Sequence, residues 1–202
     1  MTVQTHASTL GHEPVERRFG MRRGDHNENP KGISLVGLLR EDFQTNGSRW
    51  LEPGFWALAV HRFGNWRMDL PKGLRASFTA LYHAAHHLVV ALWGIDLPYN
   101  AKIGRRFRIE HHGCVHIGSR EIGDDVVVRN TATIGLLRRN EFEKPIIGNR
   151  VEVGPGACIV GGVHVGDDAV IGANSLVTSD VPEASMVLGV PAHIAHQKAH
   201  DP

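Results

Sequence analysis

The chain has 202 residues, a formal net charge of +1 and 42% hydrophobic residues, which favours one folded domain with a modest extension over a disordered chain. The balanced charge offers no broad electrostatic surface for nucleic acid, and two cysteines exclude a disulfide-rich scaffold. We find no apolar run long enough to span a membrane and no apolar core of a secretory signal, so we expect a cytoplasmic protein.

The first 94 residues predict a polar leader and then a small helical region. Residues 1–30 mix charged residues, His, Gly and Asn without periodicity, so we expect a flexible leader. Residues 31–94 carry apolar side chains at steps of three and four, with Pro53 at a helix start and a break at Leu70-Pro71-Lys72-Gly73. This pattern predicts a helical region of about three helices.

After Ile95 the aliphatic residues recur every six positions. They are Leu97, Ile103, Ile109, Val115, Ile122, Val128, Ile134, Ile147, Val153, Ile159, Val165, Ile171 and Val177, with one extra residue before Ile122 and a longer gap before Ile147. A period of six fits neither a single strand nor a helix, but it fits a parallel β-helix in which each hexapeptide forms one face of a triangular coil. We therefore predict a mainly β fold with a β-helix over residues 95–194 and a tail over 195–202 that is too polar for its periodicity to predict docking on the coil.

The gap between Ile134 and Ile147 predicts a loop that leaves the coil. Its cations, Arg138, Arg139 and Lys144, favour contact with an anion over a merely solvated loop.

One histidine-rich stretch, Glu110 to His116, could carry chemistry. An imidazole can take a proton from a hydroxyl at neutral pH when a carboxylate holds its other ring nitrogen. Asp96 lies fifteen residues before His111, close to one coil of about eighteen residues, so we expect the two side chains to meet. The remaining histidines, His86 among them, are interpreted as structural or exposed, and Cys114 and Cys158 as small residues at coil corners.

Residues 95–194 resemble the serine acetyltransferase group of hexapeptide acyltransferases. The resemblance lies in the stretch from Ile95-Asp96-Leu97-Pro98 to Ile103-Gly104, in Ile109-Glu110-His111, in the extra residue before Ile122, and in the end from Ile171-Gly172-Ala173-Asn174 to Gly189-Val190-Pro191-Ala192. The helical stretch from Pro53-Gly54-Phe55 to Asn65-Trp66 is also similar to the last N-terminal helices of that family. The resemblance implies a left-handed parallel β-helix preceded by a small α-helical region.

The resemblance also implies a mechanism. His111 would be the general base, Asp96 its orienting carboxylate, and acetyl-CoA the cosubstrate, with no metal. CoA would lie in a groove between neighbouring subunits of a homotrimer, which could pair further into a dimer of trimers. The residues that match backbone contacts with its pantetheine arm are Gly135, Pro155, Gly156 and Ala173. Arg138 or Arg139 would meet its phosphates, an inference from charge.

This chain departs from the pattern of the serine enzymes at the residues that would bind the acceptor. Glu110 replaces the aspartate beside the histidine, Asp42 would stand for a second acceptor-binding aspartate, and Lys144 stands where those enzymes have a histidine. L-serine, which would give O-acetylserine for cysteine biosynthesis, is favoured, with Glu110 and Asp42 meeting its ammonium and Lys144 its carboxylate. A sugar hydroxyl in a surface polysaccharide or a specialised pathway is the alternative.

Two readings from other classes stay open. One is a zinc lyase of the γ-carbonic anhydrase type, since His111 and His116 have a ligand-like spacing and His112 could complete a site between subunits. The other is a catalytically silent scaffold. The tail lacks the final isoleucine with which related enzymes dock on a partner, so neither partner binding nor cysteine sensing is predicted for it.

Overall fold

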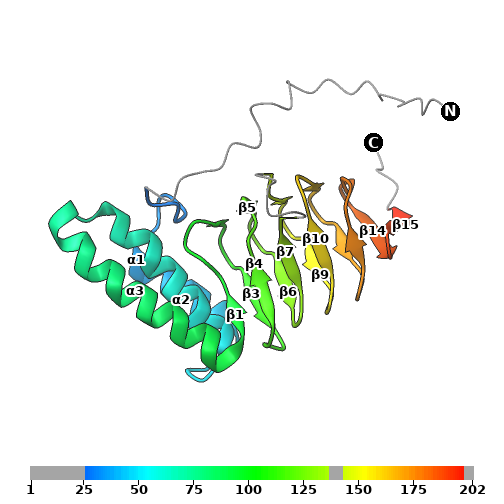
Figure 1. Ribbon diagram of the computed structural model, residues 1–202. Helices are drawn as coiled ribbons and strands as arrows, with labels where there is room; N and C mark the ends of the chain where they lie inside the picture. The colour runs from blue at the N-terminus through cyan, green and yellow to red at the C-terminus, as the bar shows by residue number, and fades with distance from the viewer. Residues whose placement is uncertain (1–25, 137–142, 198–202) are drawn as a thin grey trace.

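The structure, a computed structural model, describes residues 26–136 and 143–197. The predictions for Arg138 and Arg139, for most of the leader and for the end of the tail lie outside these residues. Figure 1 shows the described part as a stack of β-coils with a group of helices packed against one end.

Three helices and one short turn of 3₁₀ helix precede the coils. They are α1 (Leu35–Thr45), α2 (Pro53–Trp66), η2 (Arg67–Asp69) and α3 (Lys72–Trp93). The Ser34 hydroxyl accepts a hydrogen bond from the Gly37 amide and caps α1, and Pro53 occupies the first turn of α2, where its missing N–H costs nothing. Gly94 ends α3 in a left-handed conformation (φ +65°), which turns the chain into the first strand.

The strands after Gly94 form three sheets, one for each face of the triangular coil. The first sheet holds β1 (Ile95–Asp96), β4 (Val115–Ile117), β7 (Thr133–Gly135), β10 (Cys158–Val160) and β13 (Leu176–Val177). The second holds β2 (Lys102–Ile103), β5 (Glu121–Ile122), β8 (Ile146–Ile147) and β11 (His164–Val165). The third holds β3 (Arg108–Glu110), β6 (Val127–Arg129), β9 (Glu152–Val153), β12 (Val170–Ile171), β14 (Ser185–Gly189) and β15 (Ala192–Gln197). All neighbours are parallel except β14 and β15, so the β-helix prediction is confirmed.

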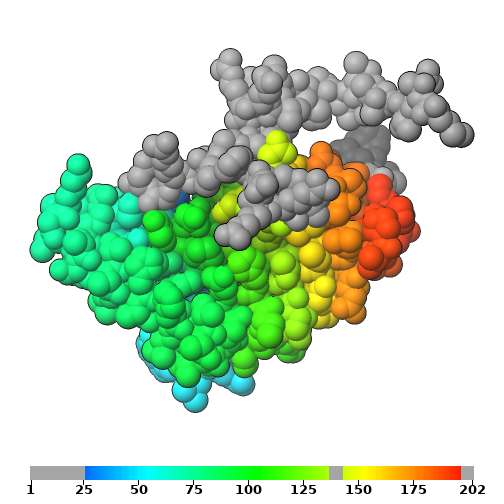
Figure 2. Space-filling view, viewed as in Figure 1, coloured from blue at the N-terminus to red at the C-terminus, as the bar shows by residue number. Residues whose placement is uncertain are grey.

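The core is the column of aliphatic side chains that the period of six predicted. Every one of those residues from Leu97 to Val177 is buried. Strand register stacks Ile103 on Ile122 and Ile147, and Ile109 on Val128 and Val153, whereas in the first sheet Ile117 instead of Val115 lies opposite Ile134. Figure 2 shows the result from outside, with successive coils lying against one another in chain order. The stacking also explains the glycines at the corners, because a Cβ built on Gly123 would lie 2.6 Å from the Gly148 carbonyl oxygen of the next coil.

A buried ion pair fixes the helical region to the first coil. The Arg62 guanidinium on α2 donates to Asp42 of α1 at 3.0 Å and to the carbonyl oxygens of Ile103 and Gly104 at 2.8 and 2.6 Å. Asn46 adds a second link, donating to the Phe107 carbonyl. The helices are therefore held rigidly at the start of the β-helix.

The end of the chain differs from the prediction. β15 turns back and pairs antiparallel with β14, with Ser185 opposite Gln197 and Met186 opposite His196. The predicted boundary after Ile194 therefore falls inside β15, because backbone hydrogen bonds hold this polar segment as far as Gln197 without any apolar period. Within the described residues, no helix has the length and apolar character needed to cross a membrane.

Candidate active site

An aspartate held by two histidines stands out on the first sheet, where the helices meet the coil. Asp96 on β1 faces His116 on β4, and their Oδ2 and Nδ1 atoms are 2.8 Å apart. The other carboxylate oxygen, Oδ1, lies 3.2 Å from Nε2 of His86 on α3. The three side chains thus join the last helix to the first two coils.

The contacts of Asp96 shift its own pKa and that of His116. Hydrogen bonds from His116 and then His86 hold the pKa of the Asp96 carboxyl far below its ordinary value of 3.8, against the effect of burial. The hydrogen bond to Asp96 raises the pKa of His116 above its ordinary 6.5, while burial and the charge of Lys144 oppose the rise. The pair therefore carries an ionised carboxylate and an imidazole that holds its proton more firmly than a free histidine.

The predicted meeting of Asp96 and His111 is not found. The register places Asp96 opposite His116, so the first coil takes twenty residues instead of about eighteen. The additional residues form a corner in which His111, Gly113 and Cys114 all adopt positive φ. His111 is exposed there at φ +53°, and within the described part of the chain its ring makes no hydrogen bond or ion pair.

His111 lies at a cavity of about 390 Å³ between the helical region and the coil. The cavity is lined by Asn46, Gly47, Arg49 and Glu52 from the helical side and by residues 108–112 from the coil. Glu110 shares this cavity, but its two carboxylate oxygens already lie 3.0 and 3.1 Å from Arg108 and Arg129. An acceptor that binds Glu110 must therefore share it with two guanidinium groups.

The prediction that Asp42 binds the acceptor is contradicted. The side chain is fully buried, and its Oδ2 lies 3.0 Å from Nε of Arg62. Burial raises the pKa of the Asp42 carboxyl, and the charge of Arg62 opposes that effect. Asp42 belongs to the link between helices and coil, and no acceptor can reach it without opening that link.

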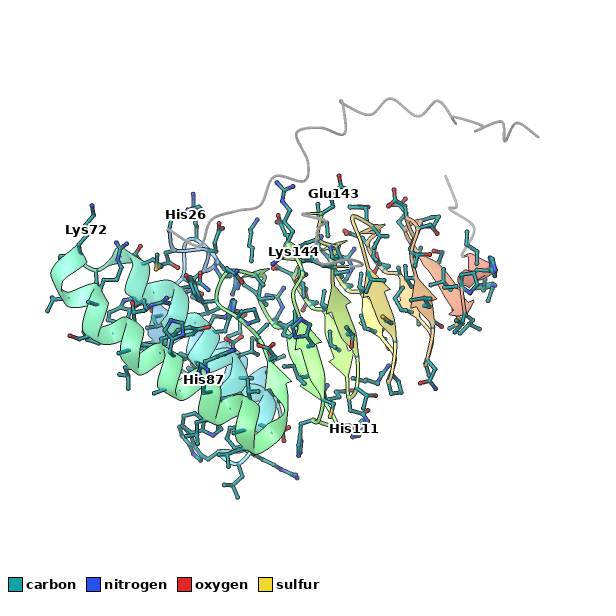
Figure 3. The ribbon with its side chains drawn as sticks, viewed as in Figure 1. His26, Lys72, His87, His111, Glu143 and Lys144 are labelled. Carbon is teal, nitrogen blue, oxygen red and sulfur yellow. The ribbon has the colours of Figure 1, made fainter. Side chains whose placement is uncertain are left out.

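Lys144 lies at the opposite edge of the coils from His111, as Figure 3 shows. Its side chain is half-buried, and burial lowers the pKa of its ammonium group. Within one protomer the structure therefore keeps Lys144, predicted to bind the acceptor, apart from His111, predicted to be the general base that acts on it.

Three of the residues predicted to hold CoA lie at the same edge as His111. Pro155, Gly156 and Ala173 occupy the corners that stack above the His111 corner, between the third and first sheets. The bonds that connect these corners run from Thr131 N to Gly113 O (2.9 Å), from Gly156 N to Asn130 O (3.0 Å) and from Asn174 N to Pro155 O (2.9 Å). The fourth, Gly135, ends β7 at the other side of the first sheet, close to His116.

Sequence reasoning missed His116 and His86 as partners of Asp96. His116 entered only as a possible zinc ligand, and His86 was taken as structural. Within the described ranges, no group of three or more His, Cys, Asp or Glu side chains is placed to hold a metal ion. Cys114 is exposed at the His111 corner, and burial raises the pKa of the Cys158 thiol, which favours its protonated form.

Comparisons with known proteins agree with this architecture. The family described as bacterial transferase hexapeptide (six repeats) matches residues 144–179. A serine acetyltransferase of Helicobacter pylori is 38% identical over 165 residues, which cover 79% of this chain and 92% of the relative. A soybean serine acetyltransferase apoenzyme has a TM-score of 0.67 at 26% identity, covering 80% of this chain and 69% of that one. A serine acetyltransferase in complex with CoA has a TM-score of 0.65 at 25% identity, covering 80% and 70%.

Proposed function

The chain belongs to the serine acetyltransferase family, and from this we propose that it transfers the acetyl group of acetyl-CoA to the hydroxyl of L-serine, giving O-acetylserine and CoA. The observation that carries the proposal is the 38% identity to a serine acetyltransferase over 92% of that relative's length. The related structure described as a complex with CoA supports CoA as the product that leaves.

We assign the role of general base to His111. It follows Ile109 and Glu110 in the matching segment, it is exposed, and it borders the cavity of about 390 Å³. An unprotonated imidazole there accepts the proton of the acceptor hydroxyl as the hydroxyl oxygen attacks the thioester carbonyl. Holding the two substrates side by side supplies much of the rate.

The other predicted contacts are distributed over the coil edges. Glu110 faces the acceptor cavity and is the candidate for the serine ammonium group, and Pro155, Gly156 and Ala173 offer backbone at the edge that His111 shares. Lys144, at the opposite edge, reaches the same acceptor only from another subunit. This separation favours a homotrimer in which each site forms between two protomers, because closed cyclic symmetry brings one edge of a protomer to the other edge of its neighbour.

Product analysis tests the acceptor directly. Purified protein is incubated with acetyl-CoA and either L-serine or a panel of sugars, and acetylated products are identified by mass spectrometry. The proposal predicts O-acetylserine as the main product. Acetylated sugar without O-acetylserine would replace L-serine by a sugar hydroxyl, and no acetylated product together with no CoA binding would remove the acyltransferase assignment.

A further inference from the structure

The outer side of the first sheet carries a row of reactive side chains. Strand register aligns Asp96 with His116, His116 with Thr133, and Thr133 with Cys158. These side chains alternate with the buried aliphatic residues and therefore point away from the core. A carboxylate, an imidazole, a hydroxyl and a thiol thus stand in line across neighbouring coils.

The His116 side chain is 50% exposed, against 37% for its partner Asp96. Its Nδ1 is taken by Asp96, but a Cβ built on Gly118 would lie 3.3 Å from its Nε2, and one built on Gly135 would lie 3.9 Å away. Neither glycine has a side chain, so the strip of backbone that Gly118 and Gly135 form puts no Cβ beside Nε2, although both glycines are themselves buried. Because the His116 side chain is 50% exposed, an extended ligand can lie on the strip and reach Nε2.

The strip coincides with a residue already proposed to contact CoA. Gly135 is the predicted contact of the pantetheine arm, whose end carries the sulfur of the thioester. That sulfur must leave as a thiolate when the acyl group moves to the acceptor, and an alkyl thiol has an ordinary pKa of about 8.5. A protonated imidazole beside it is a suitable proton donor.

We infer that His116 is the general acid of the transfer and donates its Nε2 proton to the CoA sulfur, with Asp96 and His86 as positioning residues. The inference rests on the proposed function. The oxygen–carbon bond to the acceptor forms and the carbon–sulfur bond breaks, the hydroxyl proton goes to His111, and the His116 proton goes to sulfur. Asp96 stays ionised, and exchange with water restores both histidines.

The charges around His116 suit this role. Asp96 on β1 holds the proton on the ring, and Lys144, which precedes β8, opposes it. His86 on α3 contacts the far oxygen of Asp96, and the Cys158 thiol on β10 has a raised pKa and stays neutral. The raised pKa of His116 keeps more of it protonated at neutral pH than a free histidine would be.

The test compares the pH dependence of kcat in wild type and His116→Gln, with acetyl-CoA and the acceptor that wild type uses. A general base must be unprotonated to act, so its protonation lowers kcat at low pH. A general acid must be protonated to act, so loss of its proton lowers kcat at high pH. We expect His116→Gln to reduce kcat about 100-fold and to abolish the high-pH decline. His164→Gln, an exposed histidine on β11 of the second sheet, is the matched control and should change neither.

A second variant separates chemistry from structure. Asp96→Asn removes the group that raises the pKa of His116, so the high-pH decline of kcat should move to lower pH. A merely structural link between α3 and the coil would lower the melting temperature and leave the pH profile unchanged. An unchanged pH profile in Asp96→Asn would overturn the inference. An unchanged kcat in His116→Gln, or a His116→Gln variant that loses the low-pH decline instead of the high-pH one, would overturn it as well. In each case the proposed acetyl transfer itself would stand. If wild type transfers acetyl to no acceptor, the proposed function fails, and the inference fails with it.

Discussion

Replacing Asp42 by Asn should weaken the link between the helical region and the β-helix without changing how the acceptor binds. The carboxylate is the counter-charge of Arg62, and both side chains are 0% exposed. Asparagine keeps the shape and one acceptor oxygen but removes the charge, which leaves the buried guanidinium with neutral acceptors only, the carbonyl oxygens of Ile103 and Gly104 among them. Breaking one partner of such a buried pair costs about 3–5 kcal/mol.

That cost should lower the melting temperature by about 6–20 °C for a chain of this size. The assay is thermal unfolding at fixed protein concentration, with KM for L-serine measured at a temperature where the variant is folded. Asp125→Asn is the control, because Asp125 pairs with Arg106 at the surface and such pairs contribute about 0–1 kcal/mol.

Two results bear on the reasoning. The double change Asp42→Leu with Arg62→Met should recover much of the lost stability, because it removes both buried charges. If Asp42 instead contacted the acceptor, Asp42→Asn would bind serine poorly. An unchanged melting temperature together with a KM for L-serine raised tenfold or more would therefore refute the structural role and show that Asp42 binds the acceptor.

Three further outcomes follow from the coil. Gly135→Val places a side chain on the strip beside His116, where, among the described residues, a Cβ would come within 4 Å of the His116 ring alone, at 3.8 Å, so the protein should fold while KM for acetyl-CoA rises about tenfold; an unchanged KM would place the pantetheine arm elsewhere. Gly123→Ala puts a Cβ 2.6 Å from the Gly148 carbonyl oxygen and should lower the melting temperature by several degrees in a thermal scan, with wild-type stability counting against the close stacking of coils. Asp96→Asn should lose most stability relative to wild type between about pH 4 and pH 7. The lowered pKa of Asp96 means that its contribution disappears as pH falls below its ordinary 3.8, and the raised pKa of His116 means that the contribution also disappears as pH rises above 6.5. Urea midpoints across pH would check this, and a difference independent of pH would contradict it.

The sequence was sufficient for the coil because its signal repeats. Each aliphatic residue of the series from Ile103 to Val177 is buried, so one irregular position, such as Val115, does not change the period. The helical region also followed from local signals, since Pro53 and the apolar spacing mark helices that the structure places at nearly the same residues.

The side-chain contacts of the candidate site could not be predicted from the six-residue period. Counting about eighteen residues per coil pointed Asp96 toward His111, but the wide corner at His111–Cys114 lengthens this coil and moves the partner to His116. His86 comes from a helix, and the docking of that helix on the coil is a long-range contact with no sequence period. The burial of Asp42 is of the same kind, because its partner Arg62 lies on another helix.

We propose that His111 removes the proton of the L-serine hydroxyl during transfer from acetyl-CoA. The measurement is the rate of free CoA release at saturating L-serine for wild type, His111→Ala and His164→Ala, the last being an exposed histidine on β11 that lies outside the cavity. We predict serine-dependent release that falls at least about 100-fold in His111→Ala and stays near wild type in His164→Ala. Serine-dependent release that persists in His111→Ala would contradict it.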